Sequence, residues 1–237
     1  MGSALRTILI FLLLAWCGQK CQAQGPDDKS WATRETAFEQ LRSLQSEGRL
    51  SAQDELTIIH DLEFENAFLQ TGIALDEGYG EYYANLIASV AGLRNVGSIR
   101  ALVGAIDTGI MATSALVQFG NRAVGPVALV LTSKTSSVTQ RFAATLVFSR
   151  MLDSPWHERL SAESIRQMRD ALLPSLTDDG FSQRMEAIEA LTKLRDTTLL
   201  PIFERIAESD SYVEAGTGIR RVRVAAAQAV TVLTKSH

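Results

Sequence analysis

The sequence predicts an all-α protein, a short right-handed α-solenoid of roughly four or five stacked helical hairpins with an N-terminal helical cap. Three observations carry this prediction. From Trp31 onward, apolar residues recur at the spacing of one helix face. Period-two alternation with hairpin turn signals, which indicates strands, is missing from the sequence. One arrangement of polar and small residues returns at spacings of 27 to 44 residues, as expected for stacked units.

The first 23 residues are typical of a secretory signal peptide. Arg6 supplies a basic start, residues 8–16 supply an apolar stretch, and Cys21-Gln22-Ala23 is a small-x-small cleavage pattern. Because the apolar stretch is shorter than the roughly 20 residues that span a bilayer, we expect cleavage near Ala23 and no membrane span afterwards. The predicted location is extracytoplasmic, either periplasmic or secreted.

Removal of residues 1–23 takes away both cysteines, Cys17 and Cys21. The remaining chain then has no disulfide, no cysteine nucleophile and no cysteine metal ligand, so its apolar core must hold it together. The full chain carries a net charge of −4. An acidic protein binds nucleic acid poorly unless its basic residues gather on one face, so we expect no nucleic-acid partner.

Residues 24–80 form the predicted N-terminal helical cap. Its first helix is expected over about 31–48, where the chain reaches a glycine. Ser51 and Asp54 form a capping pair that begins a second helix, and residues 72–80 break the helical pattern. We expect this region to seal one end of the stack, because the outer face of a terminal repeat must be covered.

Residues 81–237 form the predicted repeat region, which begins with a helix over 82–93. In the repeated pattern, a polar residue is followed by small residues three, four and six positions later and by an apolar residue at seven. Small residues at these offsets let two helices approach closely. Copies of the pattern, the first two weaker than the others, begin at Tyr83, Ile110, Gln140, Arg184 and Arg223.

A proline precedes each of the three strong copies. Pro126, Pro174 and Pro201 lie in apolar helical stretches that end shortly before the helix with the small residues. Proline removes a helix hydrogen bond and bends the helix axis. The repeating unit is therefore predicted to be a kinked first helix, a short polar turn and a straight second helix.

Two segments of the repeat region, 172–194 and 199–233, resemble HEAT repeats. The resemblance covers residues 124–233 and extends more weakly back to about Tyr82. It implies an α-solenoid and usually a protein-binding scaffold, but it identifies no partner, because a fold does not fix a function.

In the HEAT family, an aspartate in the turn and an arginine early in the second helix commonly form a ladder between neighbouring repeats. Asp178 or Asp179 with Arg184 fits this ladder, and Asp210 with Arg223 is a second candidate pair. The unit that begins at Gln140 has Lys-Thr-Ser-Ser in its turn, so it departs from the family pattern.

The sequence favours no metal, cofactor or catalytic site. His60 and Glu63 could share a metal, but a stable site needs three or four ligands. His157 and His237 are the only other histidines, one in a linker and one at the terminus. We therefore expect a solvated helix face at His60. No Gly-x-Ser-x-Gly motif is present, although carboxylates distant in sequence could still meet.

Two Gly-x-Gly pairs and a group of tyrosines complete the candidate motifs. The pairs at 78–80 and 216–218 lack the third glycine of a dinucleotide loop, so we expect helix-breaking turns at both. Tyr79, Tyr82 and Tyr83 could form an aromatic binding edge, but burial against the first repeat is the favoured interpretation.

Two loops depart from the repeat pattern. Trp156, in residues 153–159, either forms a recognition spot or fills the gap left by a long repeat spacing. The insertion 209–218, with Tyr212 and Val213 at its centre, either contacts a partner or is a tolerated surface loop. In both cases the second interpretation is favoured.

The sequence therefore favours a non-catalytic, exported protein-interaction scaffold that presents its second helices to an unidentified protein partner. No cofactor is expected, and the oligomeric state stays open. One alternative is an enzyme or small-ligand-binding protein with a pocket on the concave face, and another is a self-associating structural envelope protein. The first candidates for partner contacts are the polar residues Gln140, Arg184, Arg220 and Arg221.

Overall fold

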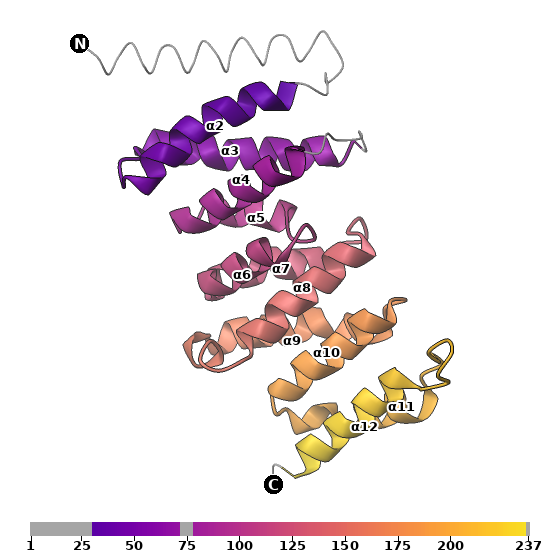
Figure 1. Cartoon of the computed structure of the whole chain (residues 1–237). Coiled ribbons are helices and arrows are strands. Elements are labelled where there is room, and N and C mark those ends of the chain that lie inside the picture. Colours follow the sequence, from indigo (N-terminus) through magenta and orange to yellow (C-terminus); the bar gives the residue numbers. More distant parts are fainter. Residues whose placement is uncertain (1–29, 72–77, 236–237) are drawn as a thin grey trace, which may run out of the picture.

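The computed structural model describes residues 30–71 and 78–235, and within these ranges every regular element is a helix. The helices follow one another in a stack that runs from the N-terminal to the C-terminal end of the described chain (Figure 1). The predicted all-α class is confirmed. The predicted signal peptide and His237 lie outside the described residues.

The helices are arranged in two layers. In the first layer α3, α5, α7 and α9 lie side by side in chain order; in the second, α2, α4, α6, α8, α10 and α12 do the same. Short 3₁₀ helices, η1 to η3, join some of them. The bounds are α2 Ser30–Ser46, α3 Ala52–Leu69, α4 Tyr79–Leu93, α5 Ser98–Gly104, α6 Ile110–Phe119, α7 Asn121–Thr132, α8 Val138–Met151, η1 His157–Arg159, α9 Ala162–Leu172, η2 Leu173–Thr177, α10 Phe181–Lys193, η3 Thr197–Leu199, α11 Leu200–Ser209 and α12 Arg221–Thr234.

The capping pair at the start of α3 is confirmed. The Ser51 side chain accepts a hydrogen bond from the backbone N–H of Asp54, and the Asp54 carboxylate accepts one from the backbone N–H of Ser51 at 2.9 Å. This capping box satisfies two N–H groups that the helix itself cannot pair. Gly48, where the first helix was expected to end, has a φ of +66°, which favours glycine.

The expectation that residues 78–80 break the helical pattern is wrong in part. Helix α4 begins at Tyr79, so Gly80 lies inside its first turn. Gly78 has a packing role instead, because a Cβ at this position would lie only 2.8 Å from a ring carbon of Trp31. The second pair behaves as expected: Gly216 and Gly218 have φ values of +85° and +70° and lie in a turn.

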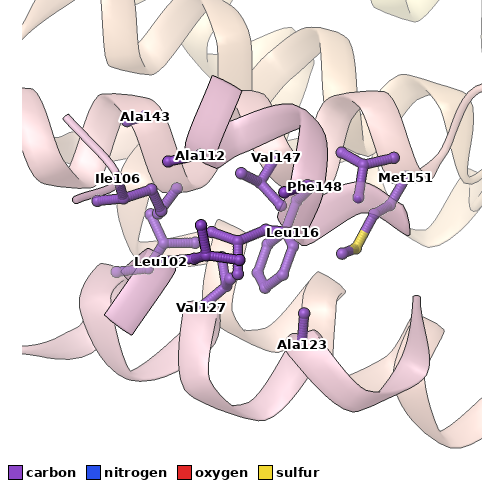
Figure 2. Close-up of a cluster of buried hydrophobic side chains, with 14 of the residues drawn as sticks. Leu102, Ile106, Ala112, Leu116, Ala123, Val127, Ala143, Val147, Phe148 and Met151 are labelled. Atoms are coloured by element: carbon purple, nitrogen blue, oxygen red, sulfur yellow. The ribbon is translucent and has the colours of Figure 1, made fainter. Parts of the chain in front are cut away.

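Most of the repeated small residues lie on second-layer helices and face the core, although Ala227 is exposed. Figure 2 shows one part of this core, where Leu102 and Leu116 meet Val127 and Phe148 from four successive helices. Fully burying an apolar side chain of this size contributes roughly 1.5–3 kcal/mol. Ala123 and the other alanines of the cluster leave room for these larger neighbours. The stack is therefore held by a continuous apolar core.

Only one of the three prolines lies in the interior of an α-helix. Pro126 lies inside α7, as expected. Pro174 lies in the short helix η2, after α9 has ended, and Pro201 lies in the first turn of α11. The chain passes from α9 directly into η2 at Leu173, and Pro174 has no N–H with which to continue the α-helical hydrogen bonds.

An arginine ladder joins the turns on one side of the second layer, but its pairing differs from the expected one. Arg141 donates to the Asp178 carboxylate at 2.8 Å, and the Arg184 guanidinium lies 3.0 Å from the Asp210 carboxylate. Each arginine therefore reaches forward to the aspartate of the next unit. Arg223 contacts the backbone carbonyl of Asp210, at 2.7 Å, and not its carboxylate.

Each ladder arginine also reaches back to a backbone carbonyl of its own turn. Arg141 donates to the carbonyl of Ser136 at 2.7 Å, and Arg184 donates to the carbonyl of Asp178 at 2.6 Å. The unit with Lys-Thr-Ser-Ser in its turn thus takes part in the ladder through Arg141. The sequence pattern placed the ladder position of this unit one residue too early, at Gln140. Gln140 instead completes a capping box with Ser137 at the start of α8.

We predict that Arg184→Ala lowers the free energy of unfolding by about 1.5–3 kcal/mol, because hydrogen bonds from a charged donor to turn carbonyls are lost and Asp210 loses its ion-pair partner. Chemical denaturation measures this change. The control is the double variant Arg220→Ala with Arg221→Ala. Arg220 is exposed and Arg221 forms only a surface ion pair with Glu214, so the change should stay within about 0.5 kcal/mol. Equal losses in both variants would contradict the structural role of Arg184.

Candidate binding groove

A groove of about 570 Å³ opens between α10 and α12 on the second layer. Its lining comes from second-layer helices and from the turn after α10, and its surface is mainly apolar, although only half of the lining residues are apolar. Met185 and Ile188 line it from α10, and Ala225 and Ala229 line it from α12. The full lining is Phe142, Phe181, Ser182, Met185, Glu186, Ile188, Glu189, Thr192, Lys193, Arg195, Ala225, Gln228, Ala229 and Val232.

The groove follows from the unequal sizes of the side chains on the two helices. Met185 and Thr192 extend from α10 at helical spacing, on the side that faces α12. On α12 the lining includes Ala225 and Ala229, whose methyl groups let the backbones approach without filling the space between the helices, beside the longer Gln228 and Val232. Ala229, one of the repeated small residues, therefore has two effects here. It permits close packing of α12 against α10, and it leaves space for the groove between them.

The insertion 209–218 packs against one end of this groove. The Tyr212 ring stacks on the Phe181 ring, with centroids 4.1 Å apart and planes 4° from parallel. The Asp210 carboxylate accepts a hydrogen bond from the backbone N–H of Tyr212, at 2.9 Å. Glu214 ties the far side of the insertion to Arg221 through a 2.6 Å ion pair. Tyr212 is thus part of the fold, whereas Val213 is exposed.

Lys193 lies at the other end of the groove and is held by four oxygen atoms. Its amino group lies 2.9 Å from the Asp153 carboxylate, 3.3 Å from Glu189, and 2.9 and 3.2 Å from the hydroxyl and carbonyl oxygens of Ser149. Burial lowers the pKa of Lys193, but the hydrogen bonds and charges of Asp153 and Glu189 outweigh it and raise the pKa above its ordinary value. Lys193 therefore stays protonated and joins α8 to α10.

The residues expected to contact a partner do not line the groove. Gln140 caps α8, Arg184 belongs to the ladder, and Arg221 pairs with Glu214. Arg220 is exposed and has no ion pair within the described residues. Their contact with a partner stays a prediction. Sequence reasoning did not identify Glu186 or the other lining residues, because a groove depends on side-chain sizes on two helices that lie about forty positions apart.

The predicted solvated helix face at His60 agrees with its surroundings. The His60 ring lies 3.3 Å from Glu63, which also pairs with Arg100 at 3.3 Å, and the His60 side chain is 70% exposed. Across the described part of the chain, no group of three histidine, cysteine or carboxylate side chains could hold a metal ion. Trp156 is partly buried against the core, and the Arg159 guanidinium lies 5.3 Å from its ring centre, so the favoured gap-filling interpretation fits.

A buried polar cluster at the N-terminal end is the arrangement most like a reactive centre. Glu65 is completely buried, and its carboxylate accepts hydrogen bonds from Arg34 at 2.5 Å, Tyr79 at 2.9 Å and Tyr82 at 3.1 Å. Burial and the charge of Glu65 raise the pKa of both tyrosines well above its ordinary value, so both keep their protons and act as donors. Tyr79 and Tyr82 are therefore buried, which is the interpretation that the sequence favoured over a binding edge. The cluster joins α2 to α3 and α4.

No protein-family model, curated protein or solved structure matches this chain. The function must therefore be argued from the residues and geometry above. Within residues 30–71 and 78–235, no helix is both long and apolar enough to cross a membrane.

Asp61 lies one helical turn before Glu65 and shares its surroundings. Burial is the main cause that raises the pKa of Asp61 to about 6, and the negative charge of Glu65 raises it further. Arg34 and His60 lower it, but by less. The folded chain therefore binds a proton at Asp61 more tightly than the unfolded chain between about pH 4 and pH 6. It follows that the free energy of unfolding falls as the pH rises through this window.

We predict that Asp61→Asn removes this dependence. Compared with the unchanged protein, the variant should gain about 1–3 kcal/mol of unfolding free energy between pH 4 and pH 7, because the buried negative charge is gone. Chemical denaturation across this pH range measures the difference. Asp170→Asn, at an exposed position on α9, is the control and should show no such trend. A difference for Asp61→Asn that does not change with pH would be evidence against this assignment.

Proposed function

We propose that this chain is an exported, non-catalytic protein-interaction scaffold, built as a short right-handed α-solenoid of HEAT-like helical hairpins with an N-terminal helical cap. The observation that carries the proposal is the open, mainly apolar groove between α10 and α12. Partner helices and peptides bind to apolar grooves of this kind with a few polar groups at the edge. The two-layer stacking and the leader sequence support the other parts of the proposal.

Two features favour a protein partner over a small substrate. The groove is partly open to solvent, whereas catalytic sites usually enclose their substrate and exclude water. In addition, Lys193 is held by Asp153, Glu189 and Ser149, so it is poorly placed to act as a base or nucleophile. The buried charge cluster around Glu65 also has its hydrogen bonds formed within the fold.

Site-specific photo-cross-linking in the native cell tests the proposal. A benzoylphenylalanine at Gln228, in the groove, and one at Arg220 should each give a cross-linked protein of defined mass. The same residue at Arg166, an exposed position on first-layer helix α9, is the matched control and should give none. Mass spectrometry identifies the products. Absence of any product above the Arg166 background would refute the scaffold function.

The same experiment addresses self-association. If the chain is instead a self-associating structural protein, the cross-linked product has twice the mass of the chain and contains only its own peptides. For a scaffold, we expect sedimentation velocity to show a monomer across a wide range of concentrations. A mass that rises with concentration would favour the self-associating alternative.

A further inference from the structure

We propose that the groove between α10 and α12 binds an amphipathic helix that carries a basic residue opposite Glu186. This inference rests on the proposed function and specifies the chemistry of the partner. The groove lining combines apolar side chains with four charged ones, Glu186, Glu189, Lys193 and Arg195. The fit of a helix follows from the shape of the groove, and the sign of its charge follows from which of these charges are already paired.

Shape favours a helix over an extended strand. Within the described residues no strand is present, so a partner cannot bind by adding a strand to a sheet edge. The groove follows α10 from Phe181 to Lys193, a length of about 18 Å at 1.5 Å per residue. A partner helix of three to four turns has about this length. The methyl groups of Ala225 and Ala229 provide the low surface onto which larger apolar side chains of the partner can pack.

Charge favours a basic partner near Glu186. The positive charge of Lys193 is already neutralised by Asp153 and Glu189, and Arg195 lines the groove two residues further along the chain. Glu186 lines the groove and has no ion pair with a described residue, so its negative charge is available to a ligand. Phe181, five residues before Glu186 on α10 and stacked on Tyr212, adds aromatic surface to the lining, which also attracts cations. Both features attract positive charge to the α10 side of the groove.

Two synthetic peptides of about 15 residues, the length at which isolated helices begin to form, test the inference. Both have the same leucine stripe at i, i+4 and i+7, but one carries lysines and the other glutamates at the flanking positions. The protein is labelled with ¹³C at its methionine methyl groups. Met185 reports on the groove, buried Met151 and Met168 report on the core, and exposed Met111, on α6, reports on non-specific binding.

The lysine peptide should shift the Met185 signal, leave the other three in place and bind about two- to fivefold more tightly than the glutamate peptide. Glu186→Gln should abolish this preference, and Glu186→Lys should reverse it. Glu204→Gln, at an exposed position on α11 outside the groove, is the control and should preserve it. Ala225→Leu should weaken both peptides by filling the groove, while unchanged Met151 and Met168 signals show that the core is intact.

Three results would overturn the inference. The first is equal or tighter binding of the glutamate peptide, and the second is an equal shift at Met111 and Met185. The third is no Met185 shift at about 1 mM peptide, since a dissociation constant of about 1 mM corresponds to only about 4 kcal/mol of binding free energy. These results are separate from those of the cross-linking experiment. A cross-linked partner without a basic amphipathic helix would refute this inference but not the scaffold function. Peptide binding without any cellular cross-link would refute the scaffold function but not the binding preference of the groove.

Discussion

Close approach between neighbouring helices of the second layer is the constraint on which this structure depends. Each hairpin can bury its apolar side chains only against the hairpins before and after it, because no sheet or second domain covers them in the described chain. Ala187 and Ala190 on α10, with Ala226 and Ala229 on α12, are all nearly or completely buried. Larger residues at these positions would force the helices apart and uncover the core beneath them.

The arginine ladder fixes how far each unit can slide against the next. A stripe of small residues allows close packing, but it offers few shape features that define the relative position of two helices. Arg141 and Arg184 supply this definition, because each one binds a carbonyl of its own turn and the aspartate of the following turn. Both guanidinium groups are largely buried, so a shifted arrangement would leave a charge without its partner at considerable cost.

The sequence was informative wherever the structure depends on neighbouring residues. The Ser51–Asp54 capping box and the glycine turn at Gly48 involve a few consecutive positions, and both were predicted correctly. The places of Pro174 and Pro201 within their elements were not predicted, because they depend on where each helix begins and ends, and helix ends are uncertain by a few residues from sequence alone.

The groove and the pairing of the ladder could not be predicted for a different reason. Both depend on which residues of two distant helices face each other. Ala143 and Ala144 are adjacent, so the sequence pattern fits equally well when it begins at Gln140 or at Arg141. Only the packing decides: with Arg141 aligned to Arg184, the buried residues Ala144, Val147 and Phe148 correspond to Ala187, Ala190 and Leu191.

The same alignment explains the three arginines at the start of α12. Arg223 corresponds to Arg184 and binds its own turn, as the ladder requires. Arg220 then corresponds to Phe181, which is packed under Tyr212, and Val224 corresponds to Met185 in the groove.

The face that α10 turns toward α12 is therefore apolar, whereas the matching face of α12 begins with an exposed arginine and continues with smaller, exposed residues. An exposed charge in place of an aromatic ring would lose hydration under a further apolar helix, although Val224 and Val232 on α12 are also exposed. One short stretch of sequence thus combines a ladder arginine, Arg223, with an exposed charge at Arg220.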